Sequence, residues 1–421
     1  MNVAILGVGT VGAEVANILI KNQKLITARS GKEIKPVIGV VRNLNKARNT
    51  TIPLTDDIQS VINRDDIDVY VELMGGVNEP YRVVSEILKR GKAVVTANKA
   101  LLAYHRFKLQ NLACDTPFGF EASVAGGIPI IKVLREGLSA NQILSINGIM
   151  NGTSNYILTS MMNGGVKFED ALKKAQELGY AEADPTFDIG GFDTAHKLLI
   201  LASIAYGVHG NPEDILIEGI EKITKEDIFF ANDFEYVIKL LAIAKRVGDK
   251  IELRVHPALV PKDKMIAKVD GVMNAVSVIG DAVNETMFYG PGAGGSATAS
   301  AVISDLIDIA REIKFPMLGY KAPLEIMQTE LLEQDEIRTK YYFRLKVEDK
   351  VGVLAKITNL MSENNLSIDS FLQKPHIKKE DDATLFFTTH TSLEADVKRV
   401  VKILKEQEFV KEEPFMMRIE S

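Results

Sequence analysis

The stretch 179–197 is rich in acidic side chains and ends in its single lysine, Lys197. Glycines, a proline and acids indicate a loop as far as Gly191. Asp193 then suits the N-cap or first turn of a helix over residues 194–206. The carboxylates of this stretch are those of Glu182, Asp184, Asp188 and Asp193.

Asp193 and Lys197 have i,i+4 spacing, so the carboxylate and the ammonium should meet on one face of that helix. The helix beyond them is apolar almost all round, which predicts that it is buried. A lysine where water ends and the core begins loses hydration, and its pKa can fall to values useful for proton transfer. An ordinary ion pair on a capped surface helix fits this spacing equally well.

Composition limits the classes of protein to consider. A chain of 421 residues has room for two or three domains, and a net charge of -6 argues against a nucleic-acid partner. The single cysteine, Cys114, excludes an internal disulfide and fits a reducing compartment. The N-terminus has no basic region typical of a signal peptide, and no uncharged run reaches membrane-spanning length. We therefore expect a cytoplasmic protein without a membrane partner.

A glycine-rich motif follows the apolar run 2–6 and opens an amphipathic helix, and this context is typical of a dinucleotide-binding fold. Gly7 permits the tight turn, Gly9 lets a pyrophosphate approach the backbone, and Gly12 lets helix and strand pack closely. A plain glycine turn is the alternative. The cofactor contacts expected here are Gly7, Gly9, Thr10, Val11 and Gly12.

The second predicted strand, 36–41, comes late because 23–35 inserts a polar segment. Arg42 follows it, at the position where NAD-preferring folds carry an acid for the ribose hydroxyl. Lys46 and Arg48 add further cations. Such a group suits a 2'-phosphate, which favours NADP and leaves NAD open; solvated surface charge is the plainer interpretation.

Strands and helices then alternate, which predicts a doubly wound parallel sheet of the Rossmann type. Lys99 falls just past the carboxyl end of a strand, where such sheets bind ligands. The expected elements are strand 68–73 with helix 79–90, strand 92–96 with helix 99–112, and strand 118–122.

From about residue 130 the pattern changes to a mixed α+β domain for catalysis and dimerisation. Its expected strands are 143–150, 251–259, 265–269 and 275–279. A second glycine-rich loop, 290–295, precedes a helix over 297–313 that is a candidate to pack back on the first domain. Gly294 of this loop could face the cofactor, or the loop could be a hinge.

The tail has the order β-α-β-β-α-β of a ferredoxin-like unit. A charged, poorly periodic stretch precedes it and is interpreted as a linker. The expected domains are a Rossmann domain (1–130), a catalytic and dimerisation domain (131–320), a linker (321–340) and the tail (341–421).

Residues 1 to about 320 resemble the homoserine dehydrogenase family in its monofunctional form. The tail, with its motif Asp-x-x-Gly-Val-Leu beginning at Asp349, is similar to ACT regulatory domains, which bind amino acids. The matching segments are Gly-Val-Gly-Thr-Val-Gly (7–12), Thr-Ala-Asn-Lys-Ala (96–100), Glu-Ala-Ser-Val-Ala-Gly-Gly-Ile-Pro-Ile (121–130), Asn-Gly-Thr-Ser-Asn-Tyr-Ile-Leu (151–158) and the stretch 179–197.

This resemblance implies reversible, NAD(P)-dependent reduction of L-aspartate 4-semialdehyde to L-homoserine, in threonine and methionine biosynthesis. Lys197 would be the acid/base at the reacting oxygen, with Lys99 a second ammonium near substrate and nicotinamide. Glu182 would receive the amino group of the substrate. Asp188 and Asp193 would help to hold the substrate and Lys197.

The resemblance also implies ligands besides the substrate. Glu121 and the carbonyls of Val124, Gly126 and Ile128 would hold a monovalent cation such as sodium, since a hard ion prefers oxygen ligands. Threonine would bind the ACT unit and inhibit the enzyme. A homodimer or higher homo-oligomer is expected.

Two other functions fit parts of the sequence. An aldehyde-oxidising dehydrogenase would need a cysteine nucleophile, and Cys114 has no obvious histidine partner. A non-enzymatic sensor of nucleotide and amino acid is the alternative from another class. Lys99, Asp193 and Lys197 argue against a sensor, because a sensor needs no acid/base.

Overall fold

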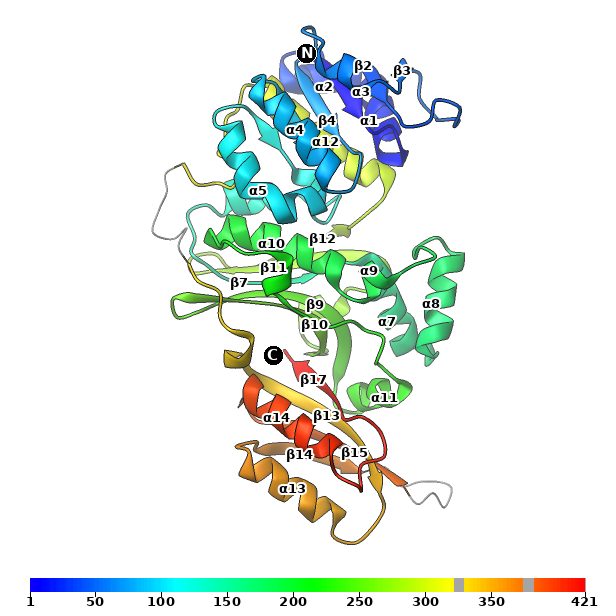
Figure 1. Cartoon of the computed structure of the whole chain (residues 1–421), viewed down its shortest axis with the longest axis vertical. Coiled ribbons are helices and arrows are strands. Elements are labelled where there is room, and N and C mark those ends of the chain that lie inside the picture. The colour runs from blue at the N-terminus through cyan, green and yellow to red at the C-terminus, as the bar shows by residue number, and fades with distance from the viewer. Residues whose placement is uncertain (322–328, 374–381, 421) are drawn as a thin grey trace. The chain divides into compact units, whose positions relative to one another are not determined.

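The computed structural model describes residues 1–321, 329–373 and 382–420 (Figure 1). They form two compact units. Unit 1 comprises Met1–Gly152, Asp193–Asp214 and Met273–Glu330, and unit 2 comprises Thr153–Phe192, Ile215–Val272 and Leu331–Ser421. Part of the expected linker, 322–328, lies outside the described residues.

Unit 1 is built on a six-stranded, wholly parallel sheet with the order β3-β2-β1-β4-β5-β6. The strand order changes direction between β1 and β4, and the ends of these strands form the switch point at which open α/β sheets bind ligands. The predicted Rossmann fold is confirmed. The strands are β1 (Asn2–Leu6), β2 (Lys35–Val40), β3 (Leu54–Thr55), β4 (Val69–Glu72), β5 (Ala93–Thr96) and β6 (Phe118–Gly119).

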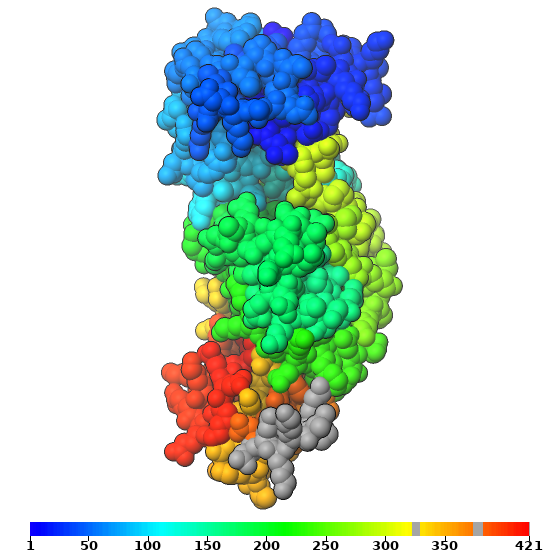
Figure 2. All heavy atoms as spheres, turned by 90° about the vertical axis from the view of Figure 1, so that its right-hand side faces the viewer, coloured from blue at the N-terminus to red at the C-terminus, as the bar shows by residue number. Residues whose placement is uncertain are grey.

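Helices cover this sheet, and a helix from far along the chain is one of them. In α12 the residues Ala299, Val302 and Leu306 are buried in the same core cluster as β1 and α1. The yellow-green atoms of this region lie against dark blue N-terminal atoms in Figure 2. The main helices of unit 1 are α1 (Thr10–Lys21), α2 (Gln23–Ser30), α3 (Ile58–Ile62), α4 (Asn78–Lys89), α5 (Lys99–Ala113), α6 (Ile130–Lys132), α10 (Phe192–Tyr206) and α12 (Gly295–Ala310).

Helix α2 lies in the segment 23–35, which the sequence marks only as a polar insertion. It buries Ile26 and ends at Gly31, whose φ of 74° is left-handed. Unit 1 also contains three antiparallel strands, in which β11 pairs with both neighbours. They are β7 (Ile143–Ile149), β11 (Met273–Gly280) and β12 (Asn284–Pro291).

Unit 2 has the strand order β9-β10-β17-β13-β15-β14. The last strand of the chain, β17, pairs in parallel with β10 and antiparallel with β13, so the tail's sheet continues that of the hairpin β9–β10. The strands are β8 (Leu216–Ile217), β9 (Tyr236–Val247), β10 (Lys250–Pro261), β13 (Arg338–Glu348), β14 (Ile368–Gln373), β15 (Asp382–Thr389), β16 (Ser392–Leu393) and β17 (Phe415–Ile419).

The tail has the order β13-α13-β14-β15-α14-β17, which confirms the predicted ferredoxin-like unit. The segment Met265–Lys268 is a 3₁₀-helix, so the strand predicted there was wrong; i→i+3 hydrogen bonds such as Val269 N–H to Ile266 O satisfy its backbone locally. The helices of unit 2 are α7 (Gly152–Gly164), α8 (Phe168–Glu177), α9 (Thr186–Ile189), α11 (Lys225–Asp233), α13 (Val353–Glu363) and α14 (Glu394–Lys405).

Candidate active site

A cavity of about 480 Å³ opens at the carboxyl ends of β1, β4 and β5. Gly7, Leu73 and Ala97 line it and follow these three strands directly. Lys99 and Lys197 line the same cavity. The sequence-predicted nucleotide motif and two predicted catalytic lysines therefore share one space within unit 1.

The glycine-rich loop leaves room for a phosphate. Gly7 has a φ of 106°, and a Cβ there would lie 2.5 Å from the carbonyl oxygen of Leu73. A Cβ on Gly12 would lie 2.4 Å from the carbonyl oxygen of Gly7, so only glycine allows this close packing. No atom lies within 4 Å of a Cβ built on Gly9, the N-cap of α1. A pyrophosphate can thus approach helix-start N–H groups.

Asp193 stands between two ammonium groups, those of Lys99 and Lys197. It lies in the first turn of α10, and its Oδ2 accepts a hydrogen bond from Lys197 Nζ at 2.7 Å. Its Oδ1 pairs with Lys99 Nζ at the start of α5. Asp193 is 2% exposed and Lys197 9%, so this is a buried, paired site and not the surface ion pair of the plainer interpretation. We call these three residues the Asp193 cluster.

Asn151 belongs to this site, although no role was predicted for it beyond its place in the family-like segment 151–158. Its side-chain amide donates to Asp193 Oδ2 at 2.9 Å, and Lys197 Nζ donates to the carbonyl of Met150 at 2.6 Å. The turn after β7 thus fixes both members of the i,i+4 pair. Its signal in the sequence was the polar run beginning at Asn151 directly after a strand.

The two lysines keep Asp193 ionised. Burial alone would raise the pKa of Asp193, but the charges of Lys197 and Lys99 outweigh it and hold that pKa well below its usual range. Burial lowers the pKa of the neighbouring His196, and the charge of Asp193 opposes that shift only in part.

A second cavity, of about 310 Å³, adjoins the glycine-rich loop and is lined by Arg42, Arg48 and Glu79. The side chain of Arg42 is 84% exposed and lies 3.7 Å from Glu79. The guanidinium of Arg48 is anchored, since it donates to the carbonyls of Val8, Asn43 and Lys46, each at 2.8 Å.

The second glycine-rich loop reaches the cavity through residues near Gly294, the one predicted to face the cofactor. Gly292, Ala293 and Thr298 line the 480 Å³ cavity. Gly294 is the N-cap of α12, with a φ of 118°. Gly294 directly follows Ala293, which lines the cavity, and contact of Gly294 with a cofactor remains a prediction.

The buried carboxylate of Glu121 caps the short helix α6. Its carboxylate accepts the N–H groups of Ile131 at 3.0 Å and Lys132 at 2.8 Å. Burial and the charge of Asp305 raise its pKa to about 7. Gly126 of the same loop lines the 480 Å³ cavity.

Two predicted substrate ligands belong to unit 2. Glu182 is exposed in the loop before α9, and Asp188 lies half-buried within α9. The backbone carbonyl of Asp188 accepts a hydrogen bond from Ser154 Oγ at 3.0 Å. Their contact with the substrate remains a prediction.

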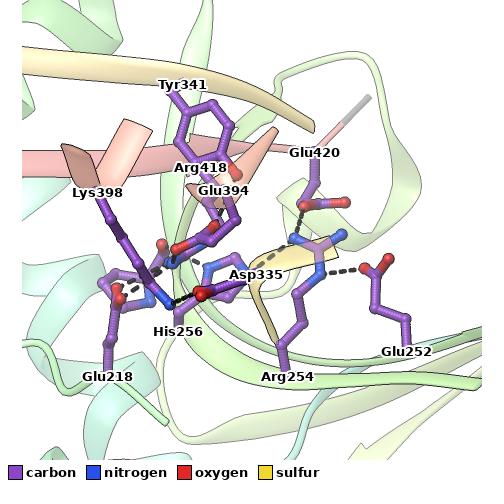
Figure 3. Close-up of polar contacts among 11 residues, drawn as sticks. Glu218, Glu252, Arg254, His256, Asp335, Tyr341, Glu394, Lys398, Arg418 and Glu420 are labelled. Atoms are coloured by element: carbon purple, nitrogen blue, oxygen red, sulfur yellow. Dashed lines mark hydrogen bonds and ion pairs between the residues drawn. The ribbon is translucent and has the colours of Figure 1, made fainter. Parts of the chain in front are cut away.

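Unit 2 holds a second buried group of charges, where the tail joins the hairpin β9–β10 (Figure 3). Arg418 is fully buried between two carboxylates: it binds Glu218 at 2.9 and 3.1 Å, and it binds Glu394 through Nε at 2.9 Å. Arg254 pairs with Glu252 and Glu420. We call these residues, with His256, the Arg418 cluster.

Other kinds of site are not found among the described residues. They contain no group of three or more His, Cys, Asp and Glu side chains arranged to hold a metal ion. No helix over residues 1–321, 329–373 and 382–420 is long and apolar enough to span a membrane. Cys114 is exposed at the end of α5 and does not line either cavity.

Comparisons with known proteins cover almost the whole chain. Residues 129–307 match the homoserine dehydrogenase family, residues 7–118 match the homoserine dehydrogenase NAD-binding domain, and residues 341–409 match the ACT domain. A homoserine dehydrogenase of Helicobacter pylori is 51% identical over 421 residues, which covers 100% of this chain and 99% of that relative.

Solved structures give the same family. A homoserine dehydrogenase from Thiobacillus denitrificans is similar with a TM-score of 0.92 and 43% identity, over 100% of this chain and 98% of that one. A hyperthermophilic archaeal homoserine dehydrogenase in complex with NADPH is 27% identical, with a TM-score of 0.62, over 73% of this chain and 96% of that one. The paired lysines beside a nucleotide cavity agree with these likenesses, and the chain belongs to the homoserine dehydrogenase family, oxidoreductases that act on a CH–OH group.

Proposed function

We propose that this chain catalyses the reversible reduction of L-aspartate 4-semialdehyde to L-homoserine, with NADP(H) preferred over NAD(H), in threonine and methionine biosynthesis. The observation that carries the proposal is the Asp193 cluster at the wall of the nucleotide cavity. The residues around the cavity fit a nicotinamide nucleotide, because the N-terminus of α1 is open above Gly9. When bound, the nucleotide supplies or accepts the hydride.

Lys197 is the proposed acid/base at the reacting oxygen. It donates a proton to the forming alkoxide in reduction and takes it back in oxidation. Lys99 adds a second positive charge that stabilises the negative oxygen. Asp193 keeps both ammonium groups in place. In the same proposal Glu182 holds the amino group of the substrate and Asp188 helps to position it.

A monovalent cation is proposed near Glu121, held also by the carbonyls of Val124, Gly126 and Ile128. The carboxylates of Glu121, Asp305 and Asp308 outnumber the two cations near them, Lys132 and Arg135: Lys132 lies 3.4 Å from Asp305 and also pairs with Asp308. Such a surplus of negative charge favours a cation. Replacing sodium by tetramethylammonium should lower Tm as well as activity; unchanged Tm in both salts would contradict the site.

The ACT unit is proposed to bind threonine and to inhibit the enzyme. Binding regulates only if the effector binds two states of the enzyme unequally, with a coupling of roughly 1–3 kcal/mol. A homodimer or higher homo-oligomer is also proposed, since β12 is the outermost strand of its sheet and most of its residues are exposed or half-buried. The exposed single thiol of Cys114 fits a cytoplasmic location.

The direct test is an assay of the purified full chain with L-homoserine and either NADP⁺ or NAD⁺, followed by the absorbance of the reduced nicotinamide. We expect turnover with both nucleotides and a higher kcat/KM with NADP⁺. Absence of turnover with either nucleotide would overturn the proposed reaction, and equal kcat/KM values would overturn the cofactor preference. Activity should survive thiol alkylation at Cys114.

A further inference from the structure

Glu72 is a buried carboxylate to which neither the sequence motifs nor the proposed mechanism gives a role. It ends β4, is 0% exposed, and stands opposite Thr96 at the end of the neighbouring strand β5. Its Oε2 accepts a hydrogen bond from Thr96 Oγ1 at 2.6 Å, and its Oε1 accepts one from the N–H of Met74 at 2.8 Å. One carboxylate thus joins the ends of two parallel strands.

The hydrogen bonds continue from Thr96 to the start of α5. Asn98 donates its N–H to Thr96 Oγ1 at 3.0 Å and its side-chain amide to the carbonyl of Gly76 at 2.8 Å. The side-chain oxygen of Asn98 accepts the N–H of Leu101 at 3.0 Å, so Asn98 is the N-cap of the helix that begins at Lys99. Glu72 is therefore linked through Thr96 and Asn98 to the start of the helix at Lys99, a residue that lines the cavity.

Both loops held in this way form the wall of the nucleotide cavity. Leu73, Gly76, Asn98 and Lys99 line the cavity of about 480 Å³. The loop after Glu72 also abuts the glycine-rich loop, since a Cβ on Gly7 would lie 2.5 Å from the Leu73 carbonyl oxygen. A shift of this loop would displace the phosphate-binding turn as well as the wall.

We propose that Glu72 is a positioning residue for hydride transfer: it fixes the two loops that shape the nicotinamide-nucleotide cavity and, through Thr96 and Asn98, the start of the helix that carries Lys99. The inference rests on the proposed binding of the nucleotide in this cavity. A displacement of about 1 Å at such a distance from the reacting atoms can cost on the order of a hundredfold in rate.

Two isosteric variants test this role in the full chain. Glu72→Gln removes the charge, and Thr96→Val removes the bridging hydroxyl. Each should raise the Kd for NADPH, measured by fluorescence titration, by about tenfold and lower kcat/KM for homoserine oxidation by about 10- to 100-fold. The double variant should be no worse than the worse single one, because both break the same link. Thr96→Ser keeps the hydroxyl and should restore wild-type values.

Tyr70→Phe is the matched control. Tyr70 lies on the same strand and is buried, but its hydroxyl donates to the carbonyls of Val61 and Ile62 at 3.2 and 3.3 Å, away from the cavity loops. This variant should lower Tm and leave Kd and kcat/KM unchanged. If Glu72→Gln and Thr96→Val behave like Tyr70→Phe, the inference is overturned.

The remaining outcomes are also decisive. If Glu72→Gln does not fold, Thr96→Val, which changes no charge, is sufficient to test the inference. A wild-type chain that binds NADPH but does not oxidise homoserine contradicts the proposed reaction, while the Kd comparison still tests Glu72. A wild-type chain that does not bind NADPH overturns the inference itself.

Discussion

Asp193 and Lys197 are paired at 2.7 Å one helical turn apart, and Lys197 also donates to the carbonyl of Met150 at 2.6 Å. The ammonium is therefore held by a carboxylate of its own helix and by the backbone just after β7. Because an acid/base must be within hydrogen-bond reach of the reacting oxygen, this fixed position is what the proposed chemistry requires.

Asp193→Asn should lower kcat by about a hundredfold with little change in the KM for the nucleotide. The amide keeps the shape of the carboxylate but leaves two lysines without their shared negative charge. Steady-state kinetics with homoserine measures this. Asp184→Asn is the matched control, since Asp184 is exposed and its carboxylate accepts hydrogen bonds from Thr186, two residues along the chain. Equal kcat values for both variants would exclude a role for the charge of Asp193.

Arg42→Ala should raise the KM for NADPH by about tenfold and leave the KM for NADH unchanged. The side chain of Arg42 is largely exposed, so a 2'-phosphate can reach it, and a hydrogen bond to a charged group contributes about 1.5–3 kcal/mol. Glu79→Gln should lower the KM for NADPH, since Glu79 competes for the same guanidinium. Equal changes in the KM values for NADPH and NADH would show that Arg42 is a solvated surface residue with no role in the choice of nucleotide.

Glu218→Gln should weaken the proposed inhibition by threonine, with about a fivefold or larger increase in the half-inhibiting concentration. Glu218 and Glu394 bind the same guanidinium, that of Arg418, so the pair links the tail to the loop after β8. Lys398→Met breaks the exposed pair with Asp335 and serves as the control. An identical threonine response in both variants would contradict this link.

Deletion of the tail should destabilise unit 2. A chain that ends near Gln334 loses β17 and so exposes the edge of β10. It also leaves the buried Arg254 without Glu420. Unpaired buried charge and a free strand edge both favour unfolding and aggregation, so the truncated chain should have a lower Tm than the full chain.

The structure predicts acid sensitivity from His256. Burial and the charges of Arg418 and Arg254 lower its pKa well below the usual value, and its Nε2 accepts from Arg254 Nη1 at 3.0 Å if Nδ1 carries the proton toward the Pro257 carbonyl. Below a pH of about 6.5 the unfolded chain binds a proton that the folded chain does not bind, so stability falls as pH falls.

For one such group the free energy of unfolding decreases by up to about 1.4 kcal/mol per pH unit in that range. His256→Gln keeps an acceptor for Arg254 and does not titrate. Urea unfolding at several pH values between about 5 and 7 should therefore show a smaller pH dependence in the variant. Parallel curves for variant and wild type would show that His256 titrates normally.

Local patterns allowed much of the site to be predicted. The glycine motif and the i,i+4 pair Asp193–Lys197 depend on neighbours in the chain, and the structure places them as expected around one cavity. Asn151 was missed because its bond to Asp193 joins the end of a strand to a helix 42 residues later. Hydrophobic periodicity carries no information on such a contact.

Pairing between residues far apart in the chain could not be predicted from the sequence either. Arg418 and Glu218 are 200 residues apart, and a charged residue in a short terminal strand usually indicates a solvated face. The place of β17 between β10 and β13 explains why Arg418 is buried instead. The tail could be predicted as a ferredoxin-like unit, but not as a continuation of another sheet.

Lys197→Met in the full chain tests the proposed acid/base most directly, with kcat for homoserine oxidation and Kd for NADPH measured on the same preparation. We expect kcat to fall by about a hundred- to ten-thousandfold, the contribution typical of a positioned acid/base, while the Kd stays near the wild-type value. A variant that keeps most of its kcat would contradict the central role of Lys197.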